Sequence, residues 1–152
     1  MLFEDVKAIY SDYPDVKVLN IAISDITGTV KFLPSKELQG WTTGISHITS
    51  ENHNGTRLSE IENNIKLYGD EIEVKSSTIH DLLTQYNITH IDYMKIDTEG
   101  HEKNIIDGHD WSVKPTTIKL EHSHINDITM KAKLESLGYM VTVETNDIYA
   151  VC

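Results

Sequence analysis

The feature that most constrains this chain is the alternation of two hydrophobic patterns along its length. Short apolar runs of the kind found in strands occupy residues 16–24, 29–33, 71–75, 91–96 and 117–121. Apolar residues at helical spacing occupy residues 2–13, 76–86, 100–107 and 127–137, and residues 139–144 and 148–151 indicate a closing hairpin. Strands that alternate with helices predict an α/β fold, with a mostly parallel sheet and a C-terminal antiparallel hairpin.

The ends of these segments give more detailed expectations. The runs at 16–24 and 91–96 are almost continuously apolar, which is typical of parallel strands covered on both faces. Helix N-caps are predicted at Ser76 or Ser77, at Thr98 and at Asp127, because short polar side chains satisfy the first free N–H groups of a helix. Gly138 is predicted to end the last helix.

The 152 residues predict a single domain that spans residues 1–152. Within it, residues 34–70 are rich in glycine and asparagine and show no regular period. We expect an irregular insertion or loop there. A binding loop and a plain surface insertion are equally compatible with its composition.

Charge and composition exclude several classes of protein. The 24 acidic and 13 basic residues give a net charge of −11, which opposes binding to nucleic acid and to anionic membrane surfaces. No apolar run approaches the ~20 residues that a membrane helix needs. The N-terminus shows no signal peptide, and Cys152 is the single cysteine, so no internal disulfide is predicted. We therefore expect a cytoplasmic protein.

Acidic residues follow two of the predicted strands. Asp97 and Glu99 come after the strand at 91–96, and Glu121 ends the strand at 117–121. Because ligands of open α/β sheets bind beyond the carboxyl ends of the strands, we expect Asp97 and Glu121 to face one crevice. A purely structural role, helix capping and solvated charge, has comparable weight on residue types alone.

Histidines accompany the second of these strand ends. His122 or His124 is a candidate general base. Together with the carboxylates they form a candidate set for a divalent metal, although no recognised metal-binding spacing is present. Ser24 and Asp25 follow the first apolar run, where they either stabilise the turn or accept hydrogen bonds from a nucleotide-like ligand. A structural role is assigned to His80 and Asp81.

The sequence IDYMKIDTEGHE at residues 91–102 resembles the signature segment of FkbM-type methyltransferases. That pattern is hydrophobic-Asp-hydrophobic-hydrophobic-Lys-Ile-Asp-x-Glu-Gly-x-Glu. Weaker resemblances follow the family's order along the chain, at residues 20–28, 78–83, 118–122 and 134–139. The resemblance covers almost the whole chain.

This resemblance implies a Rossmann-like class I methyltransferase fold that uses S-adenosylmethionine to methylate a hydroxyl of a sugar or other small metabolite. By position it implies catalytic roles for Asp97, Glu99, Glu121 and His122. It likewise implies that Ser24, Asp25 and Asp97 bind the cofactor. The resemblance assigns no metal ligand, and a divalent metal stays an open alternative.

The chain departs from the family at its beginning. The glycine-rich strand and loop, and the acidic residue that ends the second strand of the family, are not found, so we expect an N-terminally truncated sheet with a gap between residues 16–23 and 91–96. The expected partners are a small-molecule or glycan hydroxyl acceptor and either a second copy or a complementing subunit. Two alternatives remain at this stage. One is a non-catalytic subunit that needs a partner, and the other is a metal-dependent hydrolase that uses Asp97, Glu99, Glu121, His122 and His124.

Overall fold

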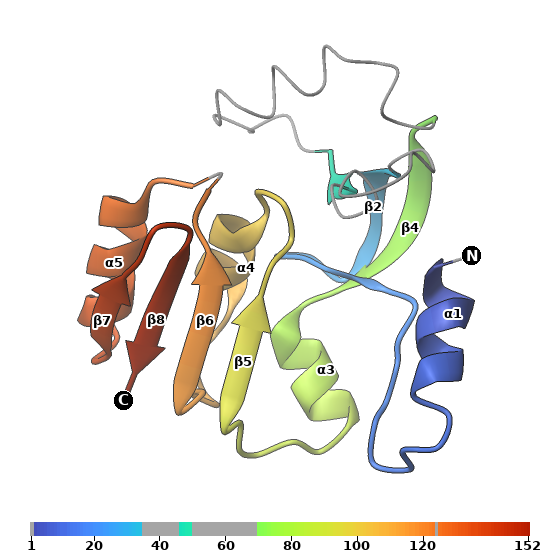
Figure 1. Ribbon diagram of the computed structural model, residues 1–152, viewed down its shortest axis with the longest axis horizontal. Helices are drawn as coiled ribbons and strands as arrows, with labels where there is room; N and C mark the ends of the chain where they lie inside the picture. The colour runs from blue at the N-terminus through green and yellow to red at the C-terminus, as the bar shows by residue number, and fades with distance from the viewer. Residues whose placement is uncertain (1, 35–45, 50–69, 124) are drawn as a thin grey trace.

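The strands that the structure describes form two four-stranded sheets. The computed structural model describes residues 2–34, 46–49, 70–123 and 125–152 (Figure 1). The first sheet has the order β1 (Ala22–Ile23), β4 (Ile72–Ser77), β2 (Gly28–Leu33), β3 (His47–Ile48). The second sheet has the order β5 (Tyr93–Ile96), β6 (Thr117–Glu121), β8 (Asp147–Val151), β7 (Met140–Val143).

The predicted Rossmann-like, mostly parallel sheet is wrong. Among the described strands, β1 pairs with β4 and β5 with β6 in parallel, whereas the pairs β2–β3, β2–β4, β6–β8 and β7–β8 are antiparallel. Parallel neighbours need a long crossover connection, but residues 144–146 are enough to turn β7 back into β8. Because β8 then lies between β7 and β6, antiparallel pairing extends from the predicted hairpin into the sheet.

The helices among the described residues are α1 (Leu2–Ile9), α3 (Ile79–Gln85), α4 (Glu102–Gly108) and α5 (Asp127–Ser136). Two of their caps lie one residue or more from the predicted positions. Thr78 caps α3, since Ser76 and Ser77 still belong to β4, and its hydroxyl accepts from the N–H of Asp81 at 3.1 Å. Asn126, not Asp127, caps α5 and accepts from the N–H of Thr129 at 2.9 Å.

The other two predicted helix ends have different outcomes. Thr98 does not cap α4, because His101 occupies the N-cap position and makes no side-chain cap hydrogen bond. Gly138 follows the C-cap of α5 with a φ of 89°, a left-handed conformation that glycine adopts without strain, so this prediction is confirmed.

The hydrophobic core lies between the second sheet and the helices α4 and α5, which cover one face of that sheet (Figure 1). Strand β6 alternates as its pattern requires, because Ile118 and Leu120 are fully buried and the other three residues of the strand are half-buried. The buried cluster comprises Ile96, Ile105, Ile106, Ile118, Leu120, Met130, Leu134, Tyr139, Ile148 and Ala150.

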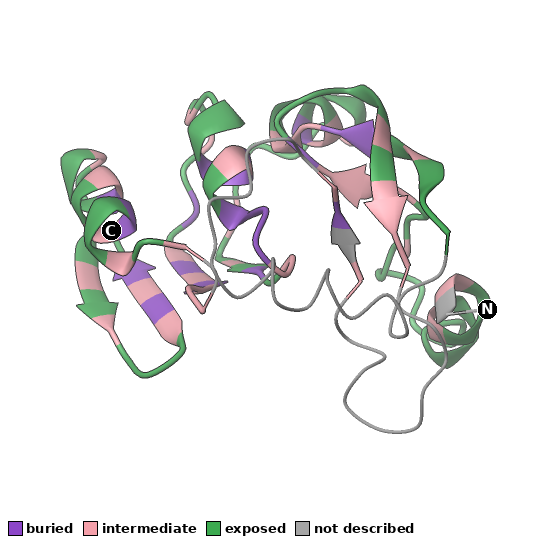
Figure 2. Ribbon diagram, turned by 90° about the horizontal axis from the view of Figure 1, so that it is seen from above, coloured by how far each residue is buried: buried purple, intermediate pink, exposed green. Residues whose placement is uncertain are grey.

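The first sheet and α1 are much less covered. The described side chains of α1 are exposed or half-buried throughout (Figure 2). Of the strand predicted at 16–24, only Ala22 and Ile23 pair in a sheet, and Val16 and Leu19 are exposed. The strand predicted at 91–96 is not covered on both faces either, because Tyr93 is exposed.

Most of the irregular segment predicted at 34–70 lies outside the described residues. The described part of it contributes β3, which pairs with β2. No helix among the described residues has both the length and the apolar character needed to cross a lipid bilayer.

Candidate functional site

Three carboxylates meet where β5 and β6 end. Ile96 and Leu120 are partners in the parallel ladder, so the residues that follow them, Asp97 after β5 and Glu121 at the end of β6, lie side by side. With Glu99 they form a cluster in which one oxygen of each side chain lies within 4.8 Å of the others. The structure therefore brings together three of the four residues that the sequence suggested for catalysis.

A lysine lies beside this cluster. The Lys95 ammonium donates to Oδ2 of Asp97 at 2.7 Å, and this hydrogen bond, together with the Asp97 charge, raises the pKa of Lys95. Lys119 on β6 lies 3.0 Å from Asp147, and hydrogen bonds with Asp147 and Tyr149 raise its pKa. Three gathered carboxylates favour a cation, which can be an organic ammonium or sulfonium group or a divalent ion that prefers oxygen ligands.

The loop that carries Glu99 is held by a fourth carboxylate, that of Glu102. Glu99 and Gly100 have φ values of 55° and 108°. Glu102 is 1 % exposed. Its Oε1 accepts two hydrogen bonds from Thr98, one from the backbone N–H at 2.7 Å and one from the side-chain hydroxyl at 2.9 Å. Its Oε2 accepts from the N–H of Gly100 at 3.0 Å. Glu102 therefore fixes the backbone on which Asp97 and Glu99 depend.

This role of Glu102 was not predicted from the sequence. The available signal was an acidic residue in the first turn of a predicted helix, four residues after Thr98. Such a side chain can turn back to the free N–H groups that precede the helix.

Ser24 and Asp25, predicted to bind the cofactor, lie against His101 at the start of α4. The Ser24 hydroxyl donates to Oδ1 of Asp25 at 2.9 Å, and since it carries one proton it accepts from Nε2 of His101, which lies 3.1 Å away. Ser24 and His101 are both buried, whereas the Asp25 side chain is 41 % exposed. This contact connects the end of β1 with the loop that follows β5.

His122, the fourth predicted catalytic residue, is engaged in the β7–β8 turn. Its Nε2 lies 2.8 Å from the carbonyl oxygen of Glu144, to which it donates, and its backbone N–H donates to Asn146 at 2.9 Å. With Nε2 used in this way, Nδ1 is the ring atom with a lone pair to accept a proton. His124 lies outside the described residues.

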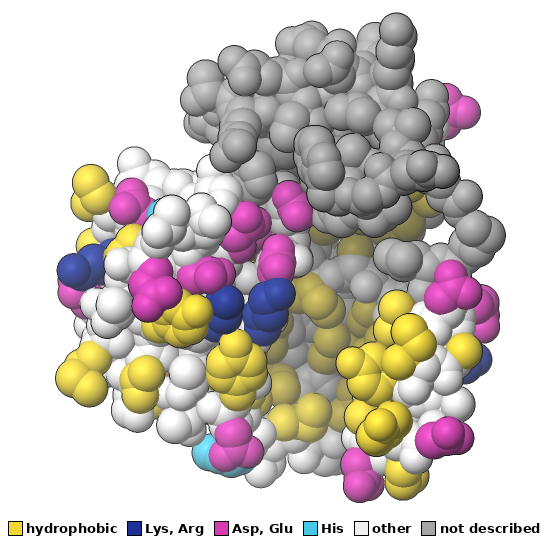
Figure 3. All heavy atoms as spheres, viewed as in Figure 1, with side chains coloured by type: hydrophobic (Ala, Val, Ile, Leu, Met, Phe, Trp, Pro, Cys, Tyr) yellow, Lys and Arg dark blue, Asp and Glu magenta, His cyan; other side chains and the backbone are white. Residues whose placement is uncertain are grey.

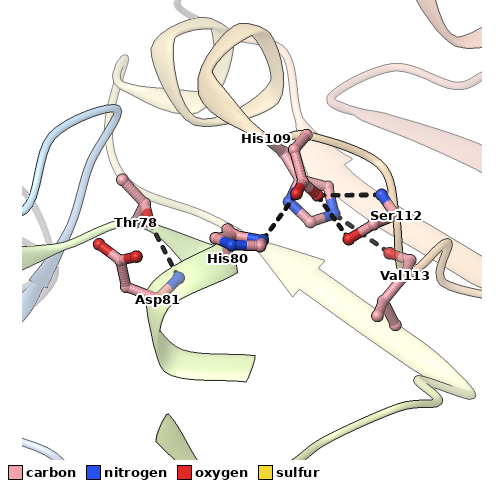
Figure 4. A network of polar contacts seen from close by, with 7 residues as sticks. Thr78, His80, Asp81, His109, Ser112 and Val113 are labelled. Carbon is pink, nitrogen blue, oxygen red and sulfur yellow. Dashed lines mark hydrogen bonds and ion pairs between the residues drawn. The ribbon is translucent and has the colours of Figure 1, made fainter. Parts of the chain in front are cut away.

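A further network ties α3 to the residues after α4 (Figure 4). Nδ1 of His80 lies 2.7 Å from Oδ2 of Asp110. The N–H and hydroxyl of Ser112, and then the neighbouring histidines His80 and His109, lower the pKa of Asp110. Nε2 of His109 lies 3.1 Å from the carbonyl oxygen of Val113. These contacts agree with the structural role predicted for His80.

An apolar groove of about 650 Å³ runs from the carboxylate cluster along β5. Leu19 and Ile23 line one side, Met94 and Ile96 of β5 line the other, and α3 forms the floor. Figure 3 shows this groove as a hollow with hydrophobic side chains along it. Asp97 and Thr98 belong to its lining, so the groove and the carboxylate cluster are continuous.

Comparison with known proteins gives one match. The family model of the methyltransferase FkbM domain matches residues 2–141, a range that contains the three residues of the carboxylate cluster and also Ser24, Asp25 and His122. No curated protein and no solved structure gives a significant match.

Proposed function

The chain belongs to the FkbM methyltransferase family, and from this premise we propose that it serves the transfer of a methyl group from S-adenosylmethionine to a hydroxyl oxygen of a sugar or other small metabolite. The observation that carries the proposal is the carboxylate cluster of Asp97, Glu99 and Glu121 at the end of an apolar groove, inside the matched range.

The chemistry of the groove fits this cofactor. S-adenosylmethionine has a flat apolar purine, sugar hydroxyls and two cationic groups, a sulfonium and an ammonium. Ile23, Met94 and Ile96 offer an apolar surface for the purine, and Asp97 and Glu99 offer negative charge for the cationic groups. When bound, the cofactor supplies an electrophilic methyl group.

Ser24 and Asp25 are assigned to the cofactor side of the site. The buried Ser24 hydroxyl orients Asp25, and the exposed part of the Asp25 carboxylate accepts hydrogen bonds from sugar hydroxyls. The contact with His101 fixes both residues relative to the loop after β5.

Asp97 is assigned to the acceptor hydroxyl. The Lys95 ammonium donates to the Asp97 carboxylate at 2.7 Å and orients it, so that the carboxylate accepts a hydrogen bond from the hydroxyl and takes the proton released as the C–O bond forms. Glu121 lies on the neighbouring strand end, and Nδ1 of His122 is a second candidate base. The main contribution of the protein is to hold the two reactants in line.

The proposal is tested first by titration of the folded protein with S-adenosylhomocysteine in a calorimeter. We expect saturable binding with a Kd on the order of 1 μM. Transfer from radiolabelled S-adenosylmethionine to a panel of sugars and small alcohols then identifies the acceptor class. Absence of binding to folded protein would overturn the proposal for this chain.

A substitution at Asp97 tests whether its carboxylate acts as the base, without disturbing the fold. Asp97→Asn keeps the shape of the side chain but removes its proton-accepting oxygen, so we expect kcat to fall by roughly 10²–10⁴-fold. Asp92→Asn, at the opposite end of β5, is the matched control and should retain kcat. Equal rates for the two variants would exclude Asp97 as the base.

A further inference from the structure

One face of helix α4 packs against the turn that follows β1. His101 is the N-cap of α4 and Gly108 is its last residue, so the two are seven residues, or about two helical turns, apart and share a face. Ile105 lies between them on that face and is buried in the core. The turn between β1 and β2 lies beside α4 (Figure 1). Both ends of this helix face reach Asp25 of that turn.

The imidazole of His101 serves this turn rather than its own helix. It occupies the N-cap position but makes no side-chain hydrogen bond to the helix. Its Nε2 instead donates to the buried Ser24 hydroxyl at 3.1 Å and lies 3.7 Å from Oδ1 of Asp25. The His101 side chain is 3 % exposed, whereas the Asp25 side chain is open to solvent on one side. The ring therefore reaches a ligand through Asp25 and does not touch the ligand itself.

Gly108 allows the backbone of Asp25 to approach the other end of this helix face. A methyl group on Gly108 would lie 2.8 Å from Cβ and 2.9 Å from Cα of Asp25. Both distances are well inside the ~3.5–4.0 Å of an ordinary carbon contact, and neither atom is able to swing away as the end of a long side chain does. Gly108 does not belong to the glycines with a positive φ. The position therefore depends on the missing side chain and not on backbone freedom.

The same turn is tied to the first sheet through its backbone. The N–H of Ser24 donates to the carbonyl oxygen of Ser77, the last residue of β4, at 3.0 Å. The first sheet thus fixes where the turn begins, and α4 fixes how far Asp25 lies from the second region. Helix α4 also follows directly on the loop that carries Asp97 and Glu99.

We propose that His101 and Gly108 are positioning residues for methyl transfer, which set the place of the Asp25 carboxylate relative to Asp97 and thereby the affinity for the cofactor. This inference rests on the proposed function, in which Asp25 accepts hydrogen bonds from the sugar hydroxyls of S-adenosylmethionine. A ligand that spans from Asp25 to the carboxylate cluster binds more tightly when both ends of its site are held in place before it arrives. Helix α4 provides this, because it begins beside one end and packs against the other.

The role of the imidazole is tested by calorimetric titration with S-adenosylhomocysteine. His101→Leu removes the N–H donor from a side chain that does not cap its helix, so the Kd should rise at least about tenfold. His101→Gln places an amide N–H near the position of Nε2 and should keep the Kd within about threefold of the unchanged protein. Circular dichroism checks that both variants are folded. Equal Kd values for the two variants would overturn the proposal.

A double-mutant cycle tests whether His101 acts through Asp25. Asp25→Ala removes the carboxylate, so in its presence His101→Leu should change the Kd by less than about twofold. Losses of affinity that multiply independently would show a general structural effect of His101 and would contradict its role as a positioning residue.

The close approach at Gly108 is tested by a pair of glycine substitutions. Gly108→Ala should raise the Kd at least about tenfold, although alanine is the better helix former. Gly138→Ala is the matched control, because the φ of 89° strains any other residue there. It should lower the denaturation temperature but keep the Kd within about twofold. A Kd that rises equally in both variants would overturn the role of Gly108.

A measurement without ligand separates this inference from the proposed function. In ¹H–¹⁵N NMR spectra, His101→Leu should move the amide resonances of Ser24 and Asp25, and His101→Gln should move them less. If these resonances stay in place, the inference is overturned, whatever the calorimetry shows. If they move as expected but the unchanged protein does not bind S-adenosylhomocysteine, the proposed methyl transfer fails while the positioning of Asp25 by α4 stands.

Discussion

The second sheet and its helices α4 and α5 bury ten hydrophobic side chains in one cluster, whereas the first sheet with α1 and α3 buries two among the described residues, Ile48 and Leu83. Each region has four strands in the part of the chain that the structure describes. The two regions differ in how well their sheets are covered. Helices pack on one face of the second sheet, whereas residues 16–21 and α1, beside the first sheet, leave apolar side chains exposed. The same number of strands thus gives very different burial.

The proposed chemistry is divided between these two regions. The carboxylate cluster belongs to the region of the second sheet, which has the larger core. Ser24 and Asp25 belong to the region of the first sheet, and they contact the second region at His101. In the proposed function, the cofactor site therefore depends on a contact between two regions that differ in burial.

The largest expected effect tests the core of the second region. Leu134→Ala deletes a fully buried side chain of α5 and should lower the free energy of unfolding by about 2–5 kcal/mol, because it leaves a cavity. Ile128→Ala on the same helix, where the side chain is 76 % exposed, should change it by less than about 0.5 kcal/mol. Urea denaturation followed by circular dichroism measures both, and equal losses would contradict the packing described here.

The next effect concerns the loop of the carboxylate cluster. Glu102→Gln replaces a buried acceptor of two backbone N–H groups by a neutral amide that also presents donors, so we expect a loss of about 1.5–3 kcal/mol. Glu135→Gln, exposed on α5, is the control and should cost little. If Glu102→Gln unfolds like the control, Glu102 does not hold this loop.

How far the sequence predicts this structure differs between the same two regions. Strand β6 has the predicted bounds, and the neighbouring ends of β5 and β6 bring Asp97 and Glu121 together, because both follow from local periodicity and one parallel pairing. The apolar run at 16–24 predicted a covered strand, but pairing depends on a neighbour that periodicity does not specify. The contact of Ser24 with His101 joins residues 77 positions apart, which a local pattern does not reveal.

A smaller effect compares helix caps in the two regions. Asn126→Ala and Thr78→Ala each remove one side-chain acceptor for a helix N–H, which is worth about 1 kcal/mol. We expect Asn126→Ala to lower the global free energy of unfolding by that amount, since α5 packs on the main core. Thr78→Ala should instead speed local hydrogen exchange in α3 with less change in global unfolding. The reverse assignment would show that the first region, not the second, limits stability.

The smallest expected effect lies in the contact between the regions, where His80 of α3 meets Asp110. Hydrogen bonds from Ser112 and the charges of His80 and His109 lower the pKa of Asp110 below its usual 3.8. A carboxyl whose pKa is lowered by folding stabilises the protein above its unfolded pKa and loses that contribution as the pH falls through its folded pKa.

Asp110→Asn should therefore be slightly less stable than the unchanged protein at neutral pH, and the difference should shrink as the pH falls below about 3.8. The effect is small because both side chains are exposed, and added salt should reduce it further. Urea denaturation across this pH range measures it, with Asp12→Asn, at an exposed carboxylate outside this network, as the control. A stability difference that persists unchanged at acidic pH would exclude Asp110 as the titrating group that joins the two regions.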